Sequence, residues 1–488
     1  MPGALSNRRS GFVGRARALA RLTAALDRSF AGRSVLVLVS GEAGIGKTAL
    51  AARLVDEASA RGARTAWGTC WHSEQAPGFW PWTQVIRSLS GDISEELVAG
   101  LAPSERAQLA RLAPELGVGA GSEPPGDGGS EQARFELFAA TAAFLERTAR
   151  LRPLLVVLDD LQWADPSSLD LLEFVARRAQ PVPLLVMGAY RHDEIDPGTS
   201  QARVLVELAG AAEPLRLAGL DEEEVAELVR LIAGDDIAER WAAEVKRRSG
   251  GHPFFVRELS HLIATHPAPG EWVAVPAAVR EVIERRLARL TPACVRVLEA
   301  AAVSGNEVLP DILADVSQGE PAQLAELVAE AVRAGILAAD PSLSGHARFA
   351  HDLFRETLYE GLSVRRRLLL HQQVGRALEG RHARGGADFP GEMARHFTAA
   401  IALDGPERAV RWAIAAARAD GASLAFTEAA THLERLRQAA EDNGIALAPE
   451  TMVDLLVIEA ADRARAGDAA SARALLERAR ELARRVPD

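Results

Sequence analysis

Short apolar runs alternate with helical patterns in the first part of the chain. Residues 35–39 read VLVLV and residues 154–158 read LLVVL, and both have the length and β-branched content of strands buried in a parallel sheet. A third apolar run, at 183–189, reads PLLVMGA. In 48–55 the apolar residues recur with helical spacing instead. The pattern predicts an α/β domain over residues 1–215, with a parallel sheet and flanking helices.

Beyond this domain the apolar positions recur mostly with helical spacing. The acidic segment 221–224 suits a helix N-terminus and opens a helical part that we expect to span 216–272. The Thr-Pro pair at 291–292 combines an N-cap residue with proline at the first helical position, inside a part expected at 273–371. For residues 372–488 we expect only helices, rich in Ala, Leu and Arg. The chain is thus predicted to have four parts.

A glycine-rich segment joins the first strand to the first helix. It reads GEAGIGKT and fits the pattern G-x-x-x-x-G-K-[ST] of a phosphate-binding loop. Its glycines let backbone N–H groups turn toward phosphate, and the helix N-terminus adds a positive dipole. Lys47 is expected to reach the β- and γ-phosphates of ATP or ADP, and the Thr48 hydroxyl to bind Mg²⁺. The predicted nucleotide contacts are Gly41, Glu42, Ala43, Gly44, Ile45, Gly46, Lys47, Thr48 and Ala49.

Charged residues follow the second and third strands. Asp159 is expected to hold Mg²⁺, directly or through water, and Asp160 to orient or deprotonate the attacking water. Arg191 ends the third strand, and open α/β sheets bind ligands at this carboxyl edge. Arg191 is a candidate sensor of the γ-phosphate, although an arginine at a strand end is often only a surface ion pair. With Lys47, these residues form the predicted catalytic set of a Mg-dependent ATPase.

Length and composition are those of a globular protein with several domains. The 488 residues, 48% of them hydrophobic, are enough to build several cores. No apolar run approaches the length of a membrane-spanning helix, and residues 1–10 lack the hydrophobic stretch of a secretion signal. We therefore expect a cytoplasmic protein without membrane contact. Cys70 and Cys294 are the only cysteines and indicate neither a disulfide framework nor a cysteine metal site.

The charge balance bears on nucleic-acid binding. A formal net charge of −11 argues against a broad electrostatic contact with DNA or RNA. The strongest local basic patch is Arg365–Arg367, beside the apolar residues Leu368–Leu370. Such a triplet is more often the solvated face of an amphipathic helix than a nucleic-acid contact. Both interpretations stay open.

The motifs occur in the order typical of one protein family. Residues 12–15 read FVGR, residues 154–172 read LLVVLDDLQWADPSSLDLL, and residues 250–255 read GGHPFF. With the phosphate loop and the strand that ends in Arg191, they resemble the STAND branch of the AAA+ ATPases. The resemblance covers roughly residues 10–375 and is strongest to the N-terminal ATPase part of the large ATP-binding LuxR-type transcriptional regulators.

The resemblance implies roles that the residues alone do not indicate. Val13, Gly14 and Arg15 would frame the adenine, and Pro253 would lie against the nucleotide from the helical lid. Taken alone, the segment around Pro253 is equally typical of a helix end, because proline restricts the residue before it.

The part at 273–371 is similar to the winged-helix domain that follows the lid in this family. His351 resembles the histidine that reads the β-phosphate in the ADP-bound state. A neutral histidine caps a helix or fills a half-buried site just as readily. The sequence does not decide between these roles.

A weak repeat lies in the last part of the chain. Residues 432–435 read HLER and residues 475–478 read LLER, an offset of 475 − 432 = 43. They resemble the start of a tetratricopeptide-like array, in which stacked helical pairs bury one another's inner faces. The chain stops soon after a repeat that looks unfinished, so we expect it to be part of a longer regulator. The DNA-binding effector expected at the far C-terminus of such proteins is absent from this sequence.

The resemblance implies an ATP-dependent switch with slow hydrolysis, closed with ADP and open with ATP and an inducer. The inducer is an unidentified small molecule or protein, and self-association is expected in the ATP state. Two alternatives from other classes stay open. One is an AAA+ protein that grips duplex DNA through its winged-helix domain, and the other is a nucleotide-bound scaffold whose helical repeats recruit a partner protein.

Overall fold

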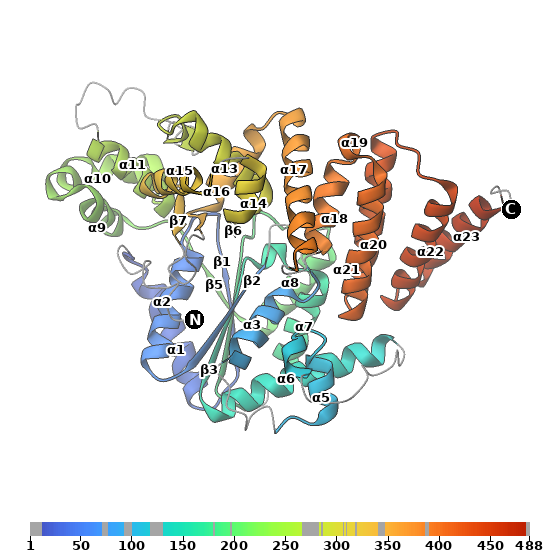
Figure 1. The fold of residues 1–488 in the computed structure, drawn as a ribbon. Helices are drawn as coiled ribbons and strands as arrows, with labels where there is room; N and C mark the ends of the chain where they lie inside the picture. Colours follow the sequence, from blue (N-terminus) through green and yellow to red (C-terminus); the bar gives the residue numbers. More distant parts are fainter. Residues whose placement is uncertain are drawn as a thin grey trace.

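The computed structural model describes most of the chain, and Figure 1 shows how its parts follow one another. Within the described residues, no helix is long and apolar enough to cross a membrane. The described residues are 12–70, 77–91, 100–117, 130–178, 181–195, 198–265, 283–284, 286–305, 307–308, 310–317, 320–339, 347–385 and 390–484.

The N-terminal part folds around a five-stranded sheet with the strand order β2-β3-β4-β1-β5. All four strand pairs are parallel. The three apolar runs predicted as strands form its centre, so the predicted parallel sheet is confirmed. The pattern does not predict β2 and β5, which form the two edges. The strands are β1 Val35–Ser40, β2 Arg64–Thr69, β3 Leu154–Asp159, β4 Leu184–Tyr190 and β5 Glu213–Arg216.

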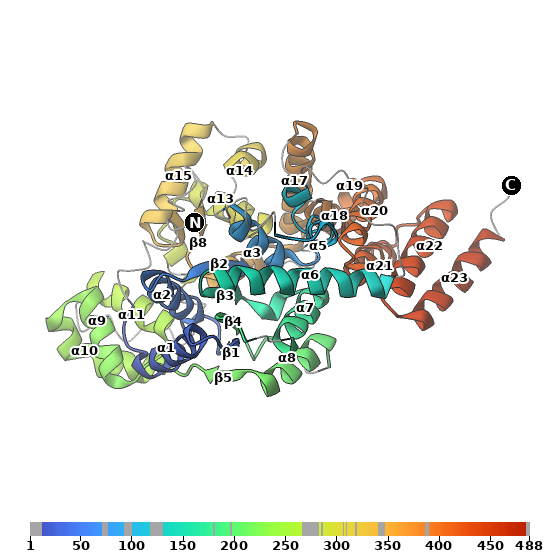
Figure 2. The same ribbon diagram turned by 90° about the horizontal axis from the view of Figure 1, so that it is seen from below.

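Helices cover both faces of the sheet, because its central strands bury side chains on both faces. Along β1, Val37 and Val39 face the core that α1 and α2 complete, whereas Leu38 faces the core formed by α3, α6, α7 and α8. Figure 2 shows the same elements from below, after a 90° rotation about the horizontal axis. The helices are α1 Ala16–Phe30, α2 Lys47–Ala60, α3 Trp80–Gly91, α5 Pro103–Leu109, η2 Pro114–Gly117, α6 Ser130–Leu151, η3 Leu161–Trp163, α7 Pro166–Arg177 and α8 Ser200–Ala211.

A lid of three helices follows β5. The Asp221 side chain accepts a hydrogen bond from the Glu224 N–H at 2.9 Å, and Glu224 accepts one from the Asp221 N–H at 3.0 Å. This capping box confirms the predicted helix start. The lid helices are α9 Glu222–Ala233, α10 Asp235–Ser249 and α11 Pro253–Thr265.

The next part combines helices with a small antiparallel sheet of order β6-β8-β7. Thr291 caps its first helix by accepting from the Cys294 N–H at 3.2 Å, with Pro292 at the first position, as predicted. One helix, one strand, two helices and two more strands give the element order of a winged helix. The elements are α13 Pro292–Ser304, β6 Glu307–Val308, α14 Pro310–Ser317, α15 Pro321–Arg333, β7 Leu337–Ala339, β8 Ala347–Phe349, α16 Asp352–Gly361 and α17 Val364–Ala383.

The basic triplet lies at the start of α17. Arg365 is exposed. Arg366 forms an ion pair with Glu299 at 3.2 Å, and the Arg367 guanidinium lies 4.6 Å from the centre of the Tyr359 ring. Two of the three arginines are therefore engaged within the chain, as expected of an amphipathic helix.

The last part consists of antiparallel helices that extend away from the sheet toward the C-terminus (Figure 1). Apolar residues of α18 to α22 share one core with α13 to α17. The predicted boundary between residues 371 and 372 falls inside α17, one continuous helix. The helices are α18 Pro390–Ala399, α19 Ile401–Asp404, α20 Pro406–Ala422, α21 Phe426–Asp442, α22 Pro449–Arg465 and α23 Ala469–Ala483.

Candidate nucleotide-binding site

The phosphate loop lies between the end of β1 and the start of α2, as predicted. Gly44 and Gly46 have φ angles of 76° and 103°, a region that glycine adopts without strain. Gly46 is the N-cap of α2 and has no side chain to cover the N–H groups of the first turn. A Cβ atom on Gly44 would lie 2.7 Å from Nε2 of His351, so the loop has room only for glycine there. This backbone fits a phosphate cradle.

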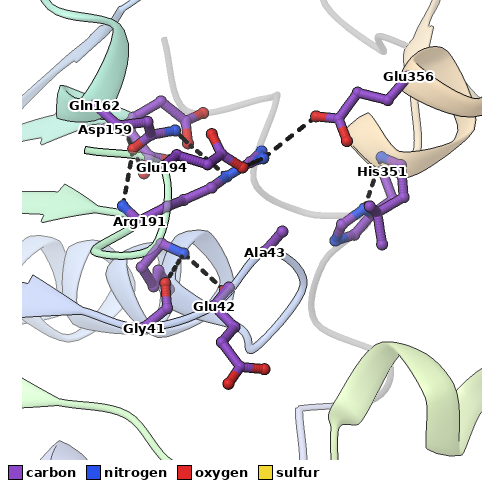
Figure 3. Close-up of polar contacts among 12 residues, drawn as sticks. Gly41, Glu42, Ala43, Asp159, Gln162, Arg191, Glu194, His351 and Glu356 are labelled. Carbon is purple, nitrogen blue, oxygen red and sulfur yellow. Dashed lines mark hydrogen bonds and ion pairs between the residues drawn. The ribbon is translucent and has the colours of Figure 1, made fainter. Parts of the chain in front are cut away.

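Lys47 lies buried over the loop. Its Nζ donates hydrogen bonds to the carbonyl oxygens of Gly41 and Glu42, at 2.8 and 2.9 Å (Figure 3). Burial lowers the pKa of Lys47, and the nearby Arg191 lowers it further, whereas Asp160 and Asp159 raise it. The Lys47 ammonium is thus held by two carbonyl oxygens close to both Arg191 and the two carboxylates, a position suited to binding an anion.

The two carboxylates lie at the end of β3. Asp159 is buried, and its Oδ1 accepts a hydrogen bond from the Asp160 N–H at 3.1 Å. Asp160 has a φ of 59°, which turns the chain sharply after the strand. Among the described residues, no cluster of three or more His, Cys, Asp or Glu side chains could hold a metal ion. Thr48 and Asp159 would share a Mg²⁺ ion with the nucleotide phosphates, as in other P-loop sites, and this role stays a prediction.

Arg191 connects the end of β4 to two other elements. Its side chain is 3% exposed, and Nη1 donates to Glu194 at 2.5 Å and to Glu356 of α16 at 3.3 Å (Figure 3). Its Nε lies 4.0 Å from Oδ1 of Asp160. Arg191 is therefore not a surface ion pair. It joins the sheet edge to the winged-helix-like part.

Gln162 is a site residue that the sequence analysis does not identify. Its Oε1 accepts from the Arg191 N–H at 3.0 Å, and its Nε2 donates to Oδ1 of Asp160 at 2.9 Å. Because a backbone N–H can only donate, these contacts fix the orientation of the amide. Gln201 in turn donates to carbonyl oxygens of the turn that carries Gln162. The only sequence signal is that Gln162 follows the two carboxylates closely.

Two histidines from different parts of the chain contact the phosphate loop. His252, just before α11, places Nε2 2.7 Å from the Ala43 carbonyl oxygen. His351 caps α16, since its Nδ1 accepts from the Leu353 N–H at 3.1 Å, and its Nε2 faces Gly44. Accepting at Nδ1 leaves the neutral ring with its proton on Nε2, a donor toward the loop. The capping role of His351 is confirmed, and its contact with a β-phosphate stays a prediction.

His252 is the residue of the GGHP segment with a visible contact, whereas the prediction names its neighbour Pro253. Pro253 is the first residue of α11, and its contact with a nucleotide stays a prediction. Burial lowers the pKa of His252. A neutral ring at this position fits its hydrogen bond to Ala43.

Val13, Gly14 and Arg15 join the phosphate loop to the lid. The Arg15 N–H donates to Glu224 of α9 at 2.6 Å, and its guanidinium donates to the Ile45 carbonyl oxygen at 2.9 Å and to that of Ala218. Gly14 has a φ of 71° and lies directly against Glu224. Val13 packs against the lid core. Their predicted contact with adenine is untested.

Comparison with known proteins adds four similarities. Residues 11–187 match the AAA ATPase domain family. An uncharacterized protein of Rhizobium meliloti is 27% identical over 440 residues, which cover 84% of this chain and 40% of that protein. The chain thus spans well under half the length of this relative.

One solved structure resembles nearly the whole chain in fold. A STAND protein with a tetratricopeptide repeat sensor from Pyrococcus horikoshii has a TM-score of 0.50 and 16% identity, over 98% of this chain and 65% of that one. Cdc6p from Pyrobaculum aerophilum is more distant, with a TM-score of 0.33 and 14% identity over 76% of this chain and 98% of that one. The chain therefore contains an AAA ATPase domain, followed by a mostly helical region, in a fold like that of a STAND protein with a tetratricopeptide repeat sensor.

Proposed function

We propose that this chain is an ATP-dependent signalling switch that hydrolyses ATP slowly, with Mg²⁺, and changes its arrangement with the bound nucleotide. In this role Lys47 and the loop N–H groups bind the phosphates, Thr48 and Asp159 hold the ion, and Asp160 orients the attacking water. The match to the AAA ATPase domain family supports nucleotide binding and hydrolysis.

One observation carries the proposal: two parts of the chain outside the ATPase domain, the lid and the winged-helix-like part, contact the phosphate loop. His252 from the lid contacts Ala43, and His351 from the winged-helix-like part faces Gly44. Arg191 at the sheet edge binds Glu356 on α16. A γ-phosphate that attracts Arg191 would compete directly with Glu356. Nucleotide state and domain arrangement would then be coupled.

The free energy needed for such a switch is similar to what a few of these contacts contribute. Moving a two-state equilibrium from 1:99 to 99:1 takes about 5.5 kcal/mol. A hydrogen bond to a charged group contributes about 1.5–3 kcal/mol. About two to four contacts that differ between ADP and ATP are therefore sufficient. We assign the arrangement described here, with Arg191 on Glu356, to the closed ADP state.

The finer role that we propose is the regulatory part of a LuxR-type transcriptional regulator. Its support is the order of the motifs along the sequence and the helical repeats that follow them. In this proposal an unidentified small molecule or protein acts as inducer, the ATP state self-associates, and DNA is contacted through an effector outside this chain. A cytoplasmic location follows from that role.

Limited proteolysis with ADP and with a non-hydrolysable ATP analogue tests the switch. We expect cleavage between the lid and α13 to become faster with the ATP analogue, because Arg191 then releases Glu356. The Lys47→Ala variant should give the same fragments with both nucleotides, since it loses the main phosphate contact. Identical fragments in the native chain at saturating nucleotide would refute the switch and favour a permanently bound scaffold.

A further inference from the structure

The repeat helices dock on the ATPase domain at a second place, away from the nucleotide. The corner between α20 and α21 inserts Leu424, Ala425 and Phe426 into the same apolar core as α3, α6 and α7. Ala425 lies directly against Gly78, where an added Cβ would come within 2.0 Å of the Ala425 Cβ. The contact is thus closely fitted and joins residues more than 300 positions apart.

The backbone is strained on both sides of this contact. Phe79 has a φ of 61° and Leu424 a φ of 66°. Neither is glycine, and bulky side chains rarely adopt this region because the Cβ atom approaches the backbone. Such strain persists only where the surrounding packing maintains it, and it is typical of segments with two states.

Carboxylates cross the contact and bind backbone groups of the ATPase domain. Glu428 of α21 accepts from the Ser167 N–H at 3.2 Å and lies 3.0 Å from the Ser167 hydroxyl. Asp420 of α20 accepts from the Gly78 N–H at 3.1 Å. Both side chains are almost fully buried. Asp165, the N-cap of α7, lies on the ATPase side.

The hydrogen-bond donors around Asp165 and Glu428 favour the proton on Glu428. Asp165 accepts three hydrogen bonds, from the Phe79 N–H at 3.2 Å, the Ser168 N–H at 2.8 Å and the Ser168 hydroxyl at 2.6 Å, and these favour its charged form. Among the residues that the structure describes, Glu428 has a hydrogen-bond partner only in Ser167. A protonated Oε2 of Glu428 can donate to the Ser167 hydroxyl oxygen over the same 3.0 Å.

We propose that the repeat helices dock on the ATPase domain through this contact only while Glu428 carries a proton. Docking then buries one neutral carboxyl beside a charged one, and loss of the proton places two like charges in a dry interface. The docked partner is the chain's own α20–α21 corner. Its release would free the segment that directly follows Asp159 and Asp160.

Electrostatics supports this assignment. Burial, together with the nearby charges of Asp165 and Asp420, raises the pKa of Glu428 to about 8, and burial raises the pKa of Asp165 to about 6. Other charged groups lie on α21, on the helices packed against it and at its junction with α20. They are His432 on α21, which contacts Asp420 at 2.9 Å, Asp462 with its partner Arg465 on α22, Glu392, Arg395 and His396 on α18, and Arg111, which donates to the Ala422 carbonyl oxygen.

The sign of the pH dependence follows from the raised pKa. An undocked, exposed Glu428 would titrate near its ordinary value of about 4.3. Between that value and about 8, the docked form binds one proton more than the undocked form. Docking is therefore fully favoured at low pH and weakens by up to roughly tenfold for each pH unit as the pH rises through this window.

Hydrogen exchange of the full chain tests the proposal. The amides of residues 77–84 and 165–170 report docking, and each variant is compared with the native chain at the same pH. From pH 6 to pH 8.5 we expect the native chain to lose at least tenfold protection relative to Glu428→Gln. That variant keeps protection, because its amide accepts from the Ser167 N–H and donates to the hydroxyl without a proton to lose. Glu441→Gln, exposed on the same helix, should behave like the native chain.

Two outcomes would overturn the proposal. One is equal loss of protection in the native chain and in Glu428→Gln, and the other is a native chain whose protection does not change with pH. Asp165→Asn gives an independent check, since it keeps a capping acceptor but removes the facing charge, and its pH dependence should be weaker than that of the native chain.

The consequence for nucleotide exchange rests on the proposed function. The ADP release rate, measured at the same pH values as the hydrogen exchange, separates the docking proposal from its link to the switch. If docking changes with pH while ADP release does not, the interface stands and its link to the switch fails.

Discussion

Glu356→Gln tests the connection between the sheet edge and α16. The Arg191 side chain is 3% exposed and the Glu356 side chain 26% exposed, with Nη1 3.3 Å from Oε1. The substitution keeps the shape and an oxygen acceptor but removes the negative charge. We expect the closed arrangement to lose stability, because this contact joins two parts of the chain that must separate when the switch opens.

The size of the effect follows from the geometry. A hydrogen bond between charged groups contributes about 1.5–3 kcal/mol. Arg191 keeps a shorter contact with Glu194 at 2.5 Å, and the glutamine keeps a neutral acceptor. We therefore expect a loss of about 1 kcal/mol, which raises the open population about fivefold.

The dissociation rate of a fluorescent ADP analogue measures this change. It should rise about fivefold in Glu356→Gln if release requires opening. Glu360→Gln, one turn further along α16 and exposed, should leave the rate unchanged. The same rate can be measured for a fluorescent, non-hydrolysable ATP analogue. The difference in dissociation rate between Glu356→Gln and the native chain should then be smaller, since the γ-phosphate competes with Glu356 for Arg191. An unchanged ADP release rate, with unchanged thermal stability, would refute the role of this contact.

Two further predictions concern the site and the helical core. Gln162→Ala removes both hydrogen bonds of the amide, so steady-state assays should show ATP turnover about tenfold lower with little change in KM; a change in KM alone would argue against a positioning role for Gln162. Burial lowers the pKa of His371 to about 3, so below pH 6.5 the unfolded chain binds a proton that the folded chain does not. The free energy of unfolding of the α17–α18 pair, measured by hydrogen exchange, should therefore fall by about 2 kcal/mol between pH 7 and pH 5. The fall should be smaller in His371→Gln.

The sheet shows where sequence patterns suffice. The strands at the centre are buried on both faces, so continuous apolar runs predict them. Edge strands bury less and leave no such run. β2 reads RTAWGT, and β5 reads EPLR, with a proline that only an edge strand tolerates. Their pairing partners, not their own pattern, make them strands.

The site divides in a similar way. The phosphate loop and the carboxylates at the end of β3 are local motifs whose chemistry depends on neighbours in sequence, and the structure brings them together with Arg191. Gln162, Glu356 and the ring of His252 depend on packing between distant segments. Glu356 is 165 positions from Arg191, and no local pattern distinguishes it from other helical glutamates. Sequence alone therefore predicts what binds phosphate but not what holds the parts together around it.

The segment from Asp159 to Ser168 connects the two interfaces. It begins with the predicted Mg²⁺ ligand, continues through Gln162, which binds both Asp160 and Arg191, and ends at the first turn of α7, where Ser167 contacts Glu428. Gln201 holds the intervening turn through three carbonyl oxygens, so we expect a displacement at one end of the segment to be felt at the other. A displacement of the repeat helices would reach the carboxylates along less than ten residues. The same path works in reverse, so nucleotide binding should change how tightly the repeats dock.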